Sequence, residues 1–97
     1  MNIEEVLNFI KRRFSKNCDW TNGNCYWFAA ILCARFQELV IWYEPVVGHF
    51  YAGNKDGSIF FDWEGVHINI EYKPIKFKEI ERTDPLWCAR LIRDCIL

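Results

Sequence analysis

Cysteine, histidine and aspartate follow one another along this chain in an order that could support nucleophilic catalysis. Cys25 stands where a polar, turn-forming segment (residues 21–24) passes into an almost wholly apolar run (26–36). This boundary predicts a thiol in the first turn of a buried helix, where backbone N–H groups and the helix dipole favour the thiolate. His49 and Asp62 follow on two predicted strands. The expected chemistry is attack by the sulfur of Cys25, with His49 as the base and Asp62 as the group that orients it.

A tight turn is expected to bring His49 and Asp62 together. The segment 54–57 reads Asn-Lys-Asp-Gly, a strong hairpin signal between predicted strands 46–53 and 58–63. The expected closing pairs are Ala52 with Ile59 and Gly53 with Ser58. In that register His49 lies directly opposite Asp62 and on the same face of the sheet. A slip of one residue would separate the two side chains.

Each of these residues also has a purely structural interpretation. A cysteine in an apolar helix is commonly a small core residue, and a histidine in an apolar strand is commonly a satisfied structural one. Asp62 lies between Phe61 and Trp63, and a partly buried carboxylate needs a partner, which His49 or Arg35 could supply. His67, on a more polar predicted strand, is the competing base.

Other candidates support this site or compete with it. Asn22 and Asn24 are candidates to stabilise an oxyanion, and Trp20 and Trp63 are candidates to line a binding groove, although these rings could equally fill the core. Cys18 could be a resolving thiol for Cys25, but it is more typical of a loop residue. The helical spacing of the remaining cysteines predicts core positions: Cys33, Cys88 and Cys95.

Composition limits the class of protein. The 97 residues predict a single domain over 1–97, and 52% apolar with 26% charged residues describe a globular protein. The net charge of −1 gives no reason to expect nucleic acid or a membrane as a partner. No secretory signal or membrane span is expected. Five cysteines without a CxxC pair favour free thiols in a reducing cytoplasm, with no metal and no cofactor.

The apolar periodicity predicts an α+β domain. An amphipathic helix is expected over 2–16, and the helix over 25–36 is apolar nearly all round, which is typical of a central, covered helix. The expected strands are 39–43, 46–53 and 58–63, followed by one or two more over 66–72 and 74–80. Thr83-Asp84-Pro85 is a helix start, so the chain should close with a helix over 86–96 that buries Leu86, Ala89, Leu91, Ile92 and Cys95. Together these elements predict two N-terminal helices, of which the second is buried on a small antiparallel sheet, and a C-terminal helix.

The segment 23–29, Gly-Asn-Cys-Tyr-Trp-Phe-Ala, resembles the nucleophile motif of transglutaminase-like proteins. It is also similar to the start of the central helix in papain-like cysteine proteases. In both groups a histidine and then an aspartate or asparagine follow on neighbouring strands, in the places taken here by His49 and Asp62. The resemblance covers about residues 20–65. The chain departs from the papain pattern because no glutamine precedes Cys25, and it is shorter than most members.

The resemblance implies a small cysteine hydrolase or acyltransferase: a thiol protease, an amidase, a deamidase or a transglutaminase-like enzyme. It would act on a protein or peptide-like substrate through Cys25, His49 and Asp62 and form an acyl-enzyme. The alternative is an inactive protein on the same fold that works by binding a protein partner, for example a phage or bacterial effector or inhibitor.

Overall fold

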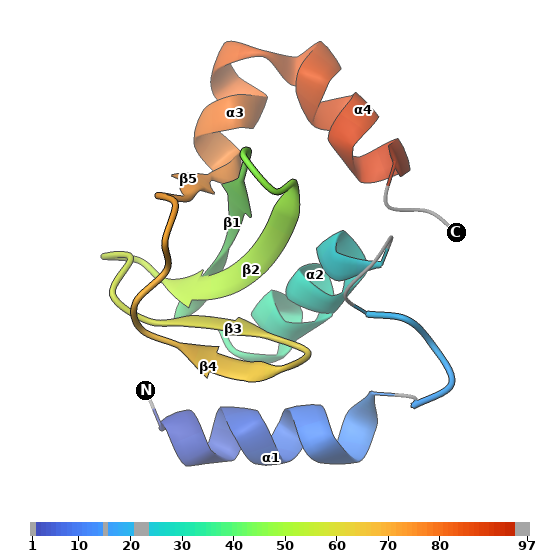
Figure 1. Ribbon diagram of the computed structural model, residues 1–97, viewed down its shortest axis with the longest axis vertical. Coiled ribbons are helices and arrows are strands. Elements are labelled where there is room, and N and C mark those ends of the chain that lie inside the picture. The colour runs from blue at the N-terminus through green and yellow to red at the C-terminus, as the bar shows by residue number, and fades with distance from the viewer. Residues whose placement is uncertain (1, 15, 21–23, 95–97) are drawn as a thin grey trace.

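A computed structural model describes residues 2–14, 16–20 and 24–94 and has the expected α+β architecture (Figure 1). In chain order, the helices are α1 (Ile3–Arg13), α2 (Cys25–Arg35), α3 (Phe77–Thr83) and α4 (Pro85–Asp94). The strands are β1 (Leu39–Glu44), β2 (His49–Asn54), β3 (Phe60–Asp62), β4 (Gly65–His67) and β5 (Ile75–Lys76). No helix among the described residues is long and apolar enough to cross a membrane.

All five strands form one antiparallel sheet in the order β4-β3-β2-β1-β5. Helix α2 packs along the sheet, α1 lies beside β4, and α3 and α4 form a pair beyond β1 and β5 (Figure 1). The core between α2 and the sheet is rich in rings, and Phe28, Phe50 and Phe61 are almost fully buried. Large rings fill volume efficiently, so this short chain obtains a dense core.

Helix α1 begins and ends through local signals. The Asn2 side chain accepts a hydrogen bond from the N–H of Glu5, and Glu4 and Glu5 stand in the first turn, where negative charge suits the helix dipole. The buried face carries Val6 and Ile10. The prediction of a helix over 2–16 was too long at its C-terminal end, because Phe14 already has extended backbone angles.

Helix α2 confirms the prediction of an apolar helix against the sheet, but it is not covered on all sides. Phe28, Ala29 and Leu32 face the core and are buried. Trp27 and Ile31, one turn apart, expose 41% and 43% of their surface. A helix that lacks a polar face therefore still presents an apolar strip to solvent here.

A capped turn replaces the first part of the predicted strand 46–53, and β2 begins only at His49. The buried carboxylate of Glu44 accepts hydrogen bonds from the N–H groups of Val46 and Val47, and Gly48 donates to the Glu44 carbonyl. Gly48 has a φ of 81°, which favours glycine. This turn fixes the position of the strand end that carries His49.

The predicted hairpin register was wrong by two residues. Ala52 pairs with Phe61 and Gly53 with Phe60, so the loop is wider than a simple four-residue turn. The Asn54 side chain accepts hydrogen bonds from the N–H groups of Ser58 and Ile59 and so stabilises the wider loop. Because side chains alternate with a period of two, a shift of two residues keeps His49 and Asp62 on one face.

The segment predicted as a strand over 74–80 is mostly helical. Only Ile75–Lys76 pairs with β1, and the chain turns into α3 at Phe77. Phe77 and Ile80, three residues apart, are buried on one face of this helix. The expected strand over 66–72 is also mostly absent, because β4 spans only Gly65–His67.

The closing helix α4 begins at Pro85, as its start signal predicts, and the N–H of Trp87 donates to the Asp84 side chain. The predicted buried face was partly wrong. Leu86 is 80% exposed and Ala89 is exposed, whereas Cys88 is buried as predicted. Leu91 and Ile92 are half-buried, and Cys95 lies outside the described residues.

Candidate active site

Cys25 is the first residue of α2 and is 4% exposed. Asn24, which precedes the helix, has non-helical backbone angles, and its carbonyl accepts the first helical hydrogen bond, from the N–H of Phe28. The apolar run that follows binds the rest of the helix to the sheet. The sulfur therefore stands at the positive end of the helix dipole.

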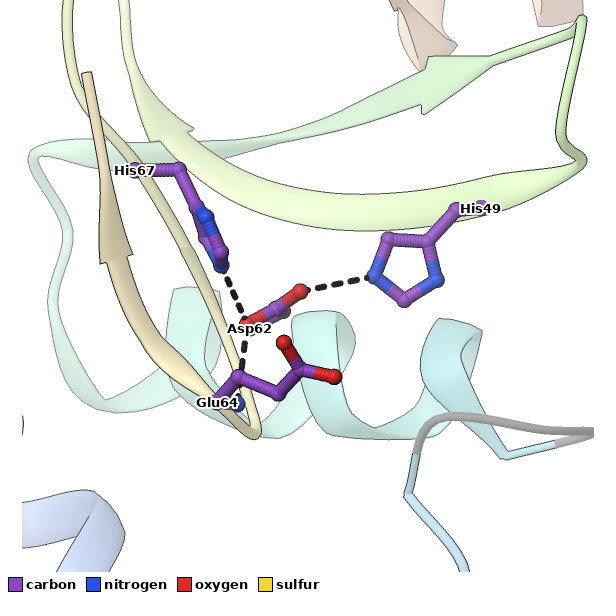
Figure 2. Close-up of polar contacts among 4 residues, drawn as sticks. All are labelled: His49, Asp62, Glu64 and His67. Atoms are coloured by element: carbon purple, nitrogen blue, oxygen red, sulfur yellow. Dashed lines mark hydrogen bonds and ion pairs between the residues drawn. The ribbon is translucent and has the colours of Figure 1, made fainter. Parts of the chain in front are cut away.

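Asp62 is held between two histidines (Figure 2). His49 Nε2 lies 3.0 Å from Asp62 Oδ2, and His67 Nε2 lies 2.7 Å from Asp62 Oδ1. The N–H of Glu64 also donates to Oδ1, at 2.9 Å. Asp62 is 6% exposed, so these three contacts compensate for the loss of water around the carboxylate.

The observed register explains how these residues meet. Asp62 lies diagonally across from His49, because residue 61 pairs with residue 52. His67 pairs with Phe60 on the neighbouring strand, which places its ring on the same face as Asp62. Three strands thus contribute to one polar cluster at the end of the sheet. Arg35, the other partner considered for Asp62, lies near Glu5 instead, with 3.9 Å between Arg35 Nη2 and Glu5 Oε1.

The histidine that hydrogen-bonds Cys25 is His49. Helix α2 begins at the end of the sheet where β2 begins (Figure 1), and Cys25 and His49 are the first residues of these two elements. Since Nε2 of His49 is engaged by Asp62, we infer that Nδ1 is the ring nitrogen that meets the sulfur. The result is a hydrogen-bonded series from Cys25 through His49 and Asp62 to His67.

The surroundings of His49 favour its protonated form. Burial alone would lower its pKa, but the hydrogen bonds with Asp62 and Cys25 outweigh this effect and raise the pKa to about 9. For Asp62, burial would raise the pKa, but the hydrogen bonds from His49 and His67 lower it below its usual value. An imidazolium next to a thiol favours the thiolate, which is the nucleophilic form.

These shifts predict how stability depends on pH. Because folding raises the pKa of His49, its stabilising contribution is complete below about 6.5 and is lost as the pH rises through about 9. Asp62 also stabilises the fold, but its contribution depends on pH in the opposite direction, because folding lowers its pKa. This contribution is lost as the pH falls below about 4. We expect the difference in free energy of unfolding between wild type and His49→Gln to shrink by about 2–3 kcal/mol between about pH 6 and pH 10. Urea unfolding of both proteins measures it, and an unchanged difference would contradict the assigned pair.

The structure places the other predicted site residues as follows. The Asn24 amide donates to the Asp19 carbonyl at 3.1 Å and lies 3.5 Å from the sulfur of Cys18, so it holds the preceding loop against the helix start. Asn22 lies outside the described residues. Trp20 and Trp63 are half-buried, and both contact the ring of Phe28, so each has a packing role at the edge of the core.

Three residues of the site were missed in the sequence. The ring of Tyr51 lies edge-on to His49, 4.6 Å between centroids, and 5.8 Å from His67. Its place two residues after His49 on one strand is a signal that could have identified it. Glu64 donates its backbone N–H to Asp62. The carboxylate of Glu44 accepts the hydrogen bond from Val46 that fixes the turn before His49. Neither contact has a clear sequence signal.

A metal site is not formed by the described residues. Within the ranges 2–14, 16–20 and 24–94, no group of three or more His, Cys, Asp or Glu side chains is arranged to hold a metal ion. The cysteines described in these ranges form no disulfide bond: Cys18, Cys25, Cys33 and Cys88.

Comparison with known proteins places the chain in a family. No curated protein and no solved structure matches it. The family described as "Phage YunG-like protein" matches residues 6–92, a range that includes Cys25, His49, Asp62 and His67. Since this match spans most of the sequence, the chain belongs to the Phage YunG-like protein family.

Proposed function

We propose that this protein is a small cysteine hydrolase or acyltransferase that acts through Cys25, His49 and Asp62. The observation that supports the proposal is the hydrogen-bonded series from the thiol to the imidazole and on to a buried carboxylate. A nucleophile, a base and a group that orients the base are the parts that acyl transfer by a thiol requires. The resemblance of segment 23–29 to papain-like and transglutaminase-like nucleophile motifs agrees with this assignment.

The proposed reaction has two halves. The thiolate of Cys25 attacks a carbonyl carbon, and the electron pair moves to the oxygen, whose negative charge faces the N-terminus of α2. Protonated His49 gives its proton to the leaving group, and a thioester remains on Cys25. Neutral His49 then takes a proton from water or from an amine, which attacks the thioester and restores the thiol.

Asp62 and His67 position the base in this scheme. The carboxylate fixes the imidazole ring of His49 and compensates its positive charge. His67 holds the other oxygen of Asp62 at 2.7 Å, so the carboxylate cannot rotate away from His49 without breaking a second hydrogen bond. We therefore assign His49 as the base and His67 as a positioning residue.

The proposed substrate is a protein or peptide-like amide or ester, and Trp20 and Trp63 are the candidates to contact it. The cysteines of the described residues form no disulfide bond, which favours a reducing compartment, so we propose the cytoplasm as the site of action. An activated acetyl ester tests the chemistry, because a reactive thiol becomes acetylated and intact-mass analysis detects the adduct. We expect one acetyl group, mapped to Cys25, and a lower acetylation rate in His49→Ala. Acetylation spread over lysines would count against the proposal.

One observation favours a second function, the binding of a protein partner without turnover. Cys25 is 4% exposed and the His49 side chain is 15% exposed, so a substrate has narrow access to the sulfur. The apolar strip formed by Trp27 and Ile31 is exposed on the same helix and would suit a partner.

Alkylation separates these two functions. We predict that iodoacetamide modifies Cys25 fastest among the thiols at about pH 6–7, because its histidine partner favours the thiolate. Burial raises the pKa of Cys33 to about 12, and burial raises that of Cys88, so both should react slowly. Peptide mapping after short exposure measures the order. Faster modification of Cys18, or modification of Cys25 only in denaturant, would favour the binding protein.

A further inference from the structure

A cavity of about 470 Å³ lies away from the polar cluster, in the angle between α3 and the outer edge of β1. Its apolar part is formed by Tyr26, Val40, Ile41 and Phe77. This volume and this mixture of rings and aliphatic groups are typical of ligand-binding clefts. The proposed reaction at Cys25 makes no use of this cavity.

The cavity continues along a stretch of sheet edge that β5 leaves uncovered. β5 pairs only with Trp42 and Tyr43 and then turns into α3, so within the described chain the outer edge of β1 over residues 39–41 pairs with no strand (Figure 1). The N–H of Leu39 in this stretch already donates to the carbonyl of Phe36. An added extended segment would therefore pair with the remaining backbone N–H and C=O groups of this edge.

Positive charge surrounds the cavity. Lys55, Lys76 and Lys78 line it, against one acidic residue, Glu81. The Lys76 ammonium also lies 5.6 Å from the centre of the Trp42 ring. The formal charge of this lining is positive although the whole chain carries −1. The surroundings therefore favour a negatively charged occupant.

We propose that this cleft binds an extended acidic peptide segment of a partner protein, which adds to β1 where β5 ends. The alternation of a strand then assigns its side chains. A residue opposite Ile41 points to the face of Tyr26 and Phe77 and should be apolar. A residue opposite Val40 points to the face of Trp42 and Lys76 and should be acidic. The preferred segment thus alternates acidic and apolar residues.

The proposal is tested by fluorescence anisotropy with a labelled peptide of alternating glutamate and valine. We expect saturable binding that Cys25→Ala does not alter, since the cleft acts independently of the thiol. Lys55→Glu combined with Lys78→Glu should weaken binding at least about tenfold, about 1.4 kcal/mol. Glu81→Gln should tighten it, because the one opposing charge is removed. The matched control is Lys16→Glu, which makes the same charge change on an exposed residue after α1 and should leave affinity unchanged.

Three further probes distinguish strand addition from simple charge attraction. Two peptides, each N-methylated on one set of alternate residues, block one or the other edge of the strand, and one of them should fail to bind. Equal binding by both, or equal binding by a lysine–valine peptide, would overturn the proposal. Lysine-dependent binding of dodecanoate in the absence of peptide binding would also overturn it, because the cavity would then take a lipid-like anion.

Discussion

Cys25→Ala should abolish acyl transfer to the activated ester while the protein remains folded. In cysteine and serine enzymes, removal of the nucleophile costs on the order of 10³-fold or more in rate. The change removes only a sulfur atom and alanine favours helices, so stability should fall by about 1–2 kcal/mol. Intact-mass analysis of the adduct and urea unfolding give the two quantities on the same samples.

The matched control is Cys33→Ala, which removes a half-buried thiol from the same helix. It should acetylate like wild type. His49→Ala should lose activity, and the double variant Cys25→Ala with His49→Ala should be hardly worse than either single change, because parts of one catalytic unit are not additive. If Cys25→Ala retains its acetylation rate, the nucleophile assignment is wrong.

Asp62→Ala should produce the largest loss of stability in the site. The substitution removes a buried carboxylate that accepts hydrogen bonds from His49, His67 and the N–H of Glu64. Removal of one partner from a buried charged cluster typically costs about 3–5 kcal/mol, because the remaining polar groups lose their compensation. The free energy of unfolding from urea titration at neutral pH measures this loss.

Glu64→Ala is the control for this prediction. It removes an exposed carboxylate from the same turn but keeps the backbone N–H that donates to Asp62, so stability should change by no more than about 0.5 kcal/mol. The loss of stability in Asp62→Asn should lie between those of Asp62→Ala and Glu64→Ala, since this change keeps the shape of the side chain but removes its charge. Equal losses for Asp62→Ala and Glu64→Ala would show that the carboxylate is not the centre of the cluster.

The parts of the site that lie on strong local signals could be predicted from the sequence. The boundary at Cys25 correctly marked the start of α2, because a polar-to-apolar change is a local property of the chain. The common face of His49 and Asp62 was also correct, although the register was not, because an error of two residues preserves the alternation.

The remaining parts depend on contacts that a single sequence does not display. The wider hairpin depends on the side-chain hydrogen bonds of Asn54 with Ser58 and Ile59. The contact of His67 with Asp62 follows from the pairing of β4 with β3. The helix at Phe77 was mistaken for a strand because a short apolar repeat suits both structures, and tertiary packing decides between them.

The pH dependence of Cys25 alkylation, compared between wild type and His49→Ala, tests the central claim most directly. If Cys25 and His49 form a thiolate–imidazolium pair, the wild-type rate of iodoacetamide modification at Cys25 should be high and nearly constant across the neutral range. In His49→Ala the rate should instead rise with pH around the ordinary cysteine pKa of about 8.5. Identical pH profiles in the two proteins would contradict the proposed pair and the function built on it.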